Sequence, residues 1–233
     1  MHTTSALYRR LLRDEHHRKE FMVRIAGVDY AQDRLIDLET HGSIFDEPDI
    51  GSCVSRQIDL TLRAPGTIPR GAKINVFVRL TLEREVSEWI PKGEFFISTR
   101  KTDKRTGHMT VHGFDAMRRT GETWLTPDYD HRSWPMPPME AARDIAGRIG
   151  VELDPRTALD PAFPVGYPVD ENGDLAMDDI LSGLAVANAG NWIITDEGKL
   201  LFLRLGDIPP ETNYLVDEYG DAITFGGVRI LVG

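Results

Sequence analysis

Lys73-Ile-Asn-Val-Phe-Val-Arg-Leu-Thr-Leu82 is the longest alternating stretch of the chain, and it decides the fold class. Its apolar side chains occupy every second position, at Ile74, Val76, Val78, Leu80 and Leu82. Successive side chains of a β-strand point to opposite faces, so this period of two predicts a strand with one buried face.

Shorter alternating segments surround this strand. They include Phe21–Ile25, Ile58–Leu62, Phe95–Thr99 and Met109–Val111, and the last two form a predicted hairpin with a basic tip at 101–107. Residues 20–114 thus contain six or seven strands with one apolar face each. Such a sheet must fold onto itself, which predicts a small antiparallel barrel or sandwich.

The pattern becomes helical after residue 115. Asp115 is placed to cap a short helix, and two longer helices are predicted at 137–149, ending at Gly150, and at 175–189. The segment 191–204 predicts a hairpin with Gly198 in its three-residue loop. The fold class is therefore mainly β with an α+β insertion: a small tube-like barrel plus a unit of two helices and a β-hairpin.

Four segments follow from these patterns. Residues 1–19 are an N-terminal helix (4–14) and a lead-in, and 20–121 form the antiparallel barrel domain. Residues 122–207 form the α+β domain. Residues 208–233 contain further strands, which either return to the barrel or start a second one.

Composition indicates an ordinary globular protein, with 41% apolar and 27% charged residues. We expect folding in the cytoplasm, because we find neither a secretory leader nor an apolar run of the ~18 residues that a membrane span needs. Cys53 is the single cysteine, so an intrachain disulfide is impossible, and we expect a buried thiol.

Charge is distributed unevenly along the chain. Residues 1–120 contain 20 Lys and Arg against 17 Asp and Glu, a net +3, whereas 121–233 contain 7 against 20, a net −13. Cations supply most of the affinity for phosphates, so the acidic second half argues against a nucleic-acid reader.

Histidines do not form a recognisable metal motif. Glu15-His16-His17 with Glu20 lacks the His-Glu-x-x-His order, and we expect it to be solvated. His108 and His112 share a strand face, but they lie too far apart along it for a common ion.

Acidic and aromatic clusters have structural explanations as well. Asp170–Asp174 resembles the opening of a calcium loop, but Leu181 occupies the place of the bidentate Glu, so we expect a turn with Asp174 as helix N-cap. Glu83, Glu85 and Glu88 predict a solvated loop face. The aromatic residues Trp124, Tyr129 and Trp134 either pin their own loop to its domain or form a sugar-stacking platform. No catalytic, cofactor or metal site is predicted.

Four passages, in order, resemble the hub proteins of tailed-phage tails, the family of baseplate hubs and tail-associated lysin N-termini. They are Asp49–Leu62 with its G-x-x-x-S entry, Ile68–Val76, the pair Gly93–Ile97 and Met109–Met117, and a helix before Asn191–Phe202. Together they cover about residues 18–205. The resemblance implies a barrel like that of the tail tube, a helical insertion, trimeric assembly around the tail axis and no catalysis in this portion.

The function expected from this resemblance is structural. The chain would belong to the tail tip or baseplate hub of a phage or prophage-derived tail, where a homotrimeric ring closes or caps the tube. Its partners would be distal tail and tail tube or tape measure proteins, and its location the virion tail. A carbohydrate- or receptor-binding tail module is the alternative. A peptidase or glycosidase is a third reading, but no acid/base pair stands out.

Overall fold

Strand β5 (Lys73–Leu82) lies inside the main sheet, between β1 and β7, and buries one face as its alternating sequence predicts. In the computed structural model Ile74, Val76, Val78 and Leu80 are all at most 4% exposed, whereas the residues between them are partly exposed. The structure describes residues 4–31, 33–42, 50–124, 134–170 and 173–204, together with the backbone of 224–225 and 228–229.

The main sheet is antiparallel throughout and follows the order β2-β1-β5-β7-β8-β4-β3, with the short β6 also pairing with β5. The bounds are β1 Arg18–Ile25, β2 Val28–Tyr30, β3 Leu35–His41, β4 Gln57–Arg63, β6 Glu85–Val86, β7 Ile90–Thr102 and β8 His108–Phe114. The hairpin predicted with a basic tip is β7–β8. Residues 28–30 form the short strand β2, for which the sequence shows no alternating pattern.

A closed barrel is not confirmed, because the strand path ends at β2 and β3, which are not paired with each other in the described part of the chain. The two ends approach at the turn that joins them. There the Arg63 backbone N–H donates to the Arg34 carbonyl at 2.8 Å, and the Tyr30 hydroxyl donates to the Pro65 carbonyl at 3.3 Å. Strand β2 is only three residues long, so the first half of β1 has no partner on that side.

Buried side chains of the sheet converge on one concave face. Val23, Ile58, Leu62, Ile74 and Phe95 belong to this core. Helix α1 (Ala6–Leu12) begins at Ser5, whose hydroxyl accepts from the Tyr8 N–H, and packs Tyr8 and Leu11 against β5 and β7. The N-terminal helix is thus confirmed, and it covers one end of the sheet's apolar face.

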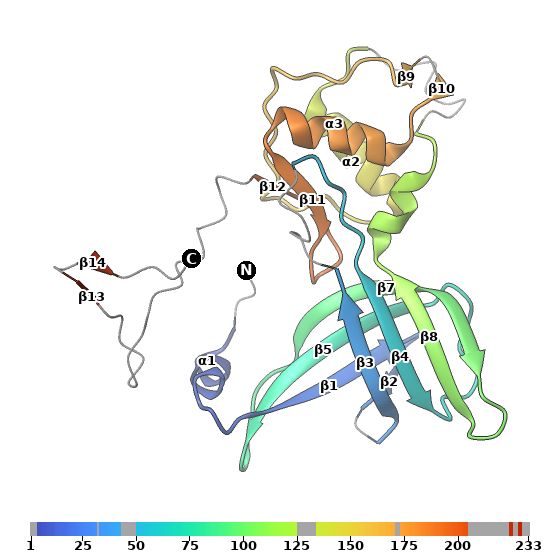
Figure 1. Cartoon of the computed structure of the whole chain (residues 1–233), viewed down its shortest axis with the longest axis vertical. Coiled ribbons are helices and arrows are strands. Elements are labelled where there is room, and N and C mark those ends of the chain that lie inside the picture. Colours follow the sequence, from blue (N-terminus) through green and yellow to red (C-terminus); the bar gives the residue numbers. More distant parts are fainter. Residues whose placement is uncertain are drawn as a thin grey trace.

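A second unit lies beyond one end of the sheet (Figure 1). It contains the short helix η1 (Ala116–Gly121), α2 (Pro138–Ile149), α3 (Met177–Ala187) and the hairpin β11 (Gly190–Ile194)–β12 (Leu200–Arg204). Two helices and a hairpin are what the sequence predicts here. Gly150 ends α2 with φ +81°, and Gly198 adopts φ +77° in the hairpin loop, as expected.

Helices α2 and α3 pack against the hairpin around Trp124, Ile145, Leu181 and Trp192, which are all buried in one cluster. This cluster and the core of the sheet share no buried residue. A short pair, β9 (Val169–Asp170) and β10 (Gly173–Asp174), precedes α3. The remaining pair, β13 (Thr224–Phe225) and β14 (Val228–Arg229), lies in the C-terminal segment.

Residues 51–54 add a further extended segment to the second unit. The Trp192 N–H donates to the Ser52 carbonyl at 2.9 Å, and the Val54 N–H donates to the Trp192 carbonyl at 3.2 Å. The chain therefore runs beside β11 and then continues directly into β4 of the main sheet. One stretch of backbone belongs to both units, although the sequence analysis assigned it to the barrel alone.

Candidate functional site

A group of charged side chains, one buried and two partly buried, lies at the junction between the sheet and the α+β unit. Arg56 lies just before β4, Asp115 follows β8, and Asp196 lies in the loop of the β11–β12 hairpin. The Arg56 guanidinium donates to Asp196 Oδ1 at 2.8 Å, and its Nε lies 3.6 Å from Asp115 Oδ2. Three distant segments thus meet at one arginine.

Asp115 is the most buried member of this group, since its side chain has no exposed surface. Burial raises its pKa to about 6, although donors favour the carboxylate. These donors are the backbone N–H groups of Arg56 and Met117, at 3.0 and 3.1 Å, and the Ser55 hydroxyl at 3.2 Å. The contact with Met117 is the helix cap that the sequence predicts.

A raised carboxyl pKa is common in active sites, but the surroundings here indicate a structural role. A general acid or base must reach the proton that it transfers, and Asp115 is fully enclosed by backbone and by Arg56. The arrangement can hold two folding units in a fixed orientation. No sequence motif pointed to Arg56 or Asp196, because their partners are about 60 and 140 residues away.

Further contacts reinforce the junction. The Glu94 carboxylate binds Lys73 at 2.8 Å and lies against the hairpin loop, where a Cβ on Gly198 would lie only 2.9 Å from the Glu94 carboxyl carbon. On the other side, the Arg119 guanidinium donates to the Ile149 carbonyl at 2.7 Å and lies 3.8 Å from the centre of the Phe96 ring. Strand β7 therefore touches both the hairpin and the end of η1.

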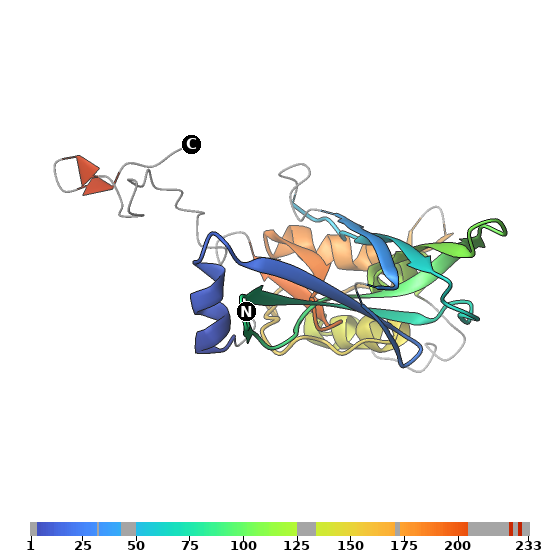
Figure 2. The ribbon, with the colours of Figure 1, turned by 90° about the horizontal axis from the view of Figure 1, so that it is seen from below.

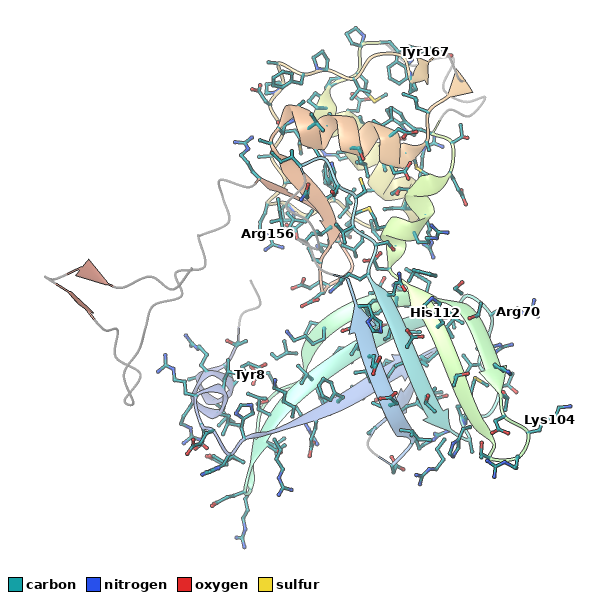
Figure 3. All side chains as sticks on the ribbon, viewed as in Figure 1. Tyr8, Arg70, Lys104, His112, Arg156 and Tyr167 are labelled. Atoms are coloured by element: carbon teal, nitrogen blue, oxygen red, sulfur yellow. The ribbon has the colours of Figure 1, made fainter. Side chains whose placement is uncertain are left out.

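The histidines are dispersed. His16 is exposed beside Glu15, and the His17 ring lies 2.6 Å from the Asp14 carbonyl. His112 points outward from β8 near the junction, with its Nδ1 2.9 Å from Asp59 Oδ1 (Figure 3). Within the described ranges no group of three or more His, Cys, Asp or Glu could hold a metal ion.

One of the two acidic segments differs from expectation. Asp174 does not cap α3: it lies in β10, and the helix begins at Met177, where the Asp179 carboxylate accepts from the Ala176 N–H at 3.0 Å. Glu171 and Asn172 lie outside the described residues. Glu83, Glu85 and Glu88 are exposed, as the sequence predicts. Glu88 also accepts from the Ser5 N–H and hydroxyl at 2.7 and 2.6 Å, which lowers its pKa. Glu85 likewise pairs with Arg10.

Aromatic residues of the predicted loop mostly fix it in place. Trp124 is fully buried, donates from Nε1 to Asp144 at 2.8 Å and meets Trp134 edge-on. Trp134 in turn contacts Tyr167, which is 54% exposed at the far end of the α+β unit (Figure 3). Tyr129 lies outside the described residues. A stacking platform built on Trp124 is therefore ruled out.

Cys53 is partly buried, whereas the sequence predicts a buried thiol. Its sulfur lies 3.7 Å from the Ser182 hydroxyl, and burial raises the pKa of the thiol to about 12. Among the described residues no helix is long and apolar enough to span a membrane.

Comparisons with known proteins identify similar structures but no matching sequence family. Neither protein families nor curated protein sequences yield a match. Among solved structures, the chain is similar to a tail protein from Neisseria meningitidis MC58, with a TM-score of 0.53 and 14% identity over 79% of this chain. It is also similar to the 43 kDa tail protein of prophage MuSo2 from Shewanella oneidensis, with a TM-score of 0.53 and 13% identity over 92% of this chain.

The chain spans about half of the Neisseria protein (51%) and 70% of the Shewanella protein. At these identities the similarity establishes the fold. This protein therefore shares its fold with two tail proteins, one of which is from a prophage.

Proposed function

We propose that the chain is a structural protein of a phage or prophage-derived tail, placed in the tail tip or baseplate hub. The observation that carries the proposal is the similarity in fold to two tail proteins, which extends over both the sheet and the α+β unit. The sequence resemblance to tail hubs covers the same region, so both point to one class of protein.

In this role three copies form a ring that closes or caps the tail tube and contacts distal tail and tail tube or tape measure proteins. Both units carry exposed apolar side chains that suit such contacts. Val28 on the sheet is 46% exposed, and Val186 on α3 is 62% exposed. Cyclic symmetry would cover the same patches on every copy.

Catalysis is not part of the proposal. The buried charges of the junction bind one another and the backbone, which suits a rigid connection between units. A carbohydrate- or receptor-binding module ranks second, because the α+β unit presents the aromatic side chains of Phe163 and Tyr167 to solvent, at 46% and 54% exposure.

The test is deletion of the gene from the phage or prophage that encodes it, followed by electron microscopy of the particles. We expect heads without completed tails, restored by the wild-type gene in trans, and labelling of the tail tip by an antibody to the chain. Normal tails that merely fail to adsorb would favour the receptor-binding module. Normal, infectious particles would refute both functions.

A further inference from the structure

A groove of about 480 Å³ lies between α3 and the segment 162–165 that precedes it along the chain. Its lining is apolar except for one exposed carboxylate, and it includes Phe163, Val165, Ile180, Leu184 and Asp179. Phe163 is 46% exposed, and Val186 on the same helix is 62% exposed. Exposed apolar surface of this kind commonly marks a contact with another molecule. We call it the α3 groove.

The surroundings of the α3 groove are acidic. The stretch 157–198 contains eight Asp and Glu but no Lys or Arg. Asp160 is exposed where the chain enters the groove segment, and its carboxylate accepts from the Ala162 N–H at 2.9 Å. Asp178 and Asp179 lie in the first turn of α3. An occupant of the groove should therefore combine an apolar side chain with positive charge.

Helix α1 presents such a combination to solvent. Its Leu12 is 51% exposed, although the other face of the helix packs against the sheet. Arg9 comes three residues before Leu12 and four before Arg13, so the three side chains share one helix face. Both arginines are exposed, and neither forms an ion pair with a residue that the structure describes.

The tip of the β7–β8 hairpin is the other exposed basic surface, and it fits the groove less well. Lys101, Lys104 and Arg105 are exposed there. The segment 101–107 contains no large apolar side chain, however, so this tip offers nothing to an apolar groove.

Within one chain α1 and the α3 groove lie apart. Figure 1 shows α1 beside the sheet and α3 in the α+β unit beyond it, and Figure 2 shows α1 at the end of the sheet. A helix docked in the groove must therefore come from another molecule. A second copy of this chain supplies an α1 with the required charge and apolar side chain.

We propose that α1 of one copy docks in the α3 groove of a second copy, with Leu12 in the groove and Arg9 and Arg13 facing its acidic surroundings. The two partners use different surfaces, so the contact is heterologous and can repeat around an axis until a ring closes. Each acidic unit then faces a basic helix and no other acidic unit. Only the threefold repetition of this contact rests on the proposed function.

Disulfide formation between two different variants of the full-length chain tests the contact. In a Cys53→Ser background, one variant carries Leu12→Cys and the other Gly183→Cys, which lines the groove and has open space for a side chain. The two variants carry tags of different length, and they are mixed in equal amounts and mildly oxidised. Random encounters would give no more mixed dimer than the two like dimers together. We expect several-fold more of the mixed dimer.

Matched variants separate docking from general stickiness. Gly147→Cys, exposed on α2 with open space around it, should pair with position 12 several-fold less than Gly183→Cys does. Arg9→Glu with Arg13→Glu should lower the 12–183 disulfide several-fold, and the neutral pair Arg9→Gln with Arg13→Gln should give an intermediate loss. Lys104→Glu with Arg105→Glu makes the same charge change at the β7–β8 tip (Figure 3) and should leave the yield unchanged.

Three results would overturn the proposal. The first is the absence of an excess of the 12–183 disulfide, and the second is a yield that depends on the charges of the β7–β8 tip instead of those of α1. The third is much slower maleimide labelling of Gly183→Cys than of Gly147→Cys in the dilute chain, which would show that the groove is already covered within one copy. All three use purified protein, so they are distinct from failure of the tail function, which the particles report.

Discussion

Asp115 joins two kinds of structure at a single residue. Asp115 follows strand β8, and its carboxylate caps helix η1 by accepting from the Met117 N–H. The same carboxylate accepts from the Arg56 backbone N–H, so it connects the sheet to the α+β unit. The polar groups of this junction lie out of water, where unsatisfied donors are costly. Loss of the Asp115 carboxylate would leave these donors without an acceptor, so it should destabilise the connection between the two units more than either unit alone.

The pH dependence of stability should report on Asp115. Its pKa is about 6 in the folded chain against an ordinary 3.8, so the folded state binds more protons than the unfolded state between these values. The free energy of unfolding should thus fall as pH rises from about 4 to about 6. One pKa unit corresponds to about 1.4 kcal/mol, so the contribution is on the order of 3 kcal/mol. Urea denaturation at several pH values measures it.

Substitution isolates this contribution. Asp115→Ala should lower stability at every pH, because two backbone N–H groups lose an acceptor, and it should flatten the profile between pH 4 and 6. Asp154→Ala is the matched control: the pKa of Asp154 is lowered to about 2, mainly by its hydrogen bonds with Arg156, so its protonation affects stability only in stronger acid. Equal slopes for the wild type and Asp115→Ala would contradict the assignment.

Gly190 of β11 lies so close to residues of β12 that there is no room for a side chain. A Cβ at this position would lie 2.2 Å from the Leu203 carbonyl oxygen and 2.5 Å from the Phe202 ring. Gly190→Ala should therefore destabilise the chain by about 1–3 kcal/mol or more, as overpacking does. Gly147→Ala, on the exposed side of α2 with open space around it, should instead stabilise it by about 0.5–1 kcal/mol. Thermal unfolding of the two variants distinguishes these effects by sign.

At the scale of elements, the segment 51–54 couples the units through Asn191. The Asn191 side-chain oxygen accepts from the N–H groups of Gly51 and Ser52, both at 3.0 Å, and so holds this segment beside β11. Asn191→Ala should cost about 1–3 kcal/mol, because the part-buried Ser52 N–H loses this acceptor, whereas the Gly51 N–H also donates to the Gly190 carbonyl at 3.0 Å. Hydrogen exchange should accelerate at residues 51–54. Gln57→Ala, exposed at the start of β4, is the control and should leave exchange there unchanged.

Local patterns predicted most elements, and long-range contacts account for the rest. The period of two in Lys73–Leu82 and the loop Asp196-Glu197-Gly198 are properties of neighbouring residues, so β5 and the β11–β12 hairpin were predicted. The start of α3 was misplaced, because Asp179, inside the helix, caps it from the third position while Asp174 pairs in β10. Glu88 bonds Ser5 across 83 residues, which no local pattern indicates.

The junction could not be predicted for the same physical reason. Arg56 has an ordinary sequence context, and its partners Asp115 and Asp196 come together only when two units fold against each other.

The largest-scale prediction concerns assembly into a threefold ring around the tail axis. Residues 1–120 carry a net charge of +3 and 121–233 a net charge of −13, so the nearly balanced sheets can meet while the acidic units point outward or to the tip. At about 0.01 M salt the Debye length is about 30 Å, so acidic units facing one another would drive the ring apart there. We expect the trimer, measured in tail particles by electron microscopy and in solution by sedimentation, to persist from high to low salt. Dissociation at low salt would place the acidic units at the interface, and a twofold dimer or a monomer in the assembled particle would refute the ring.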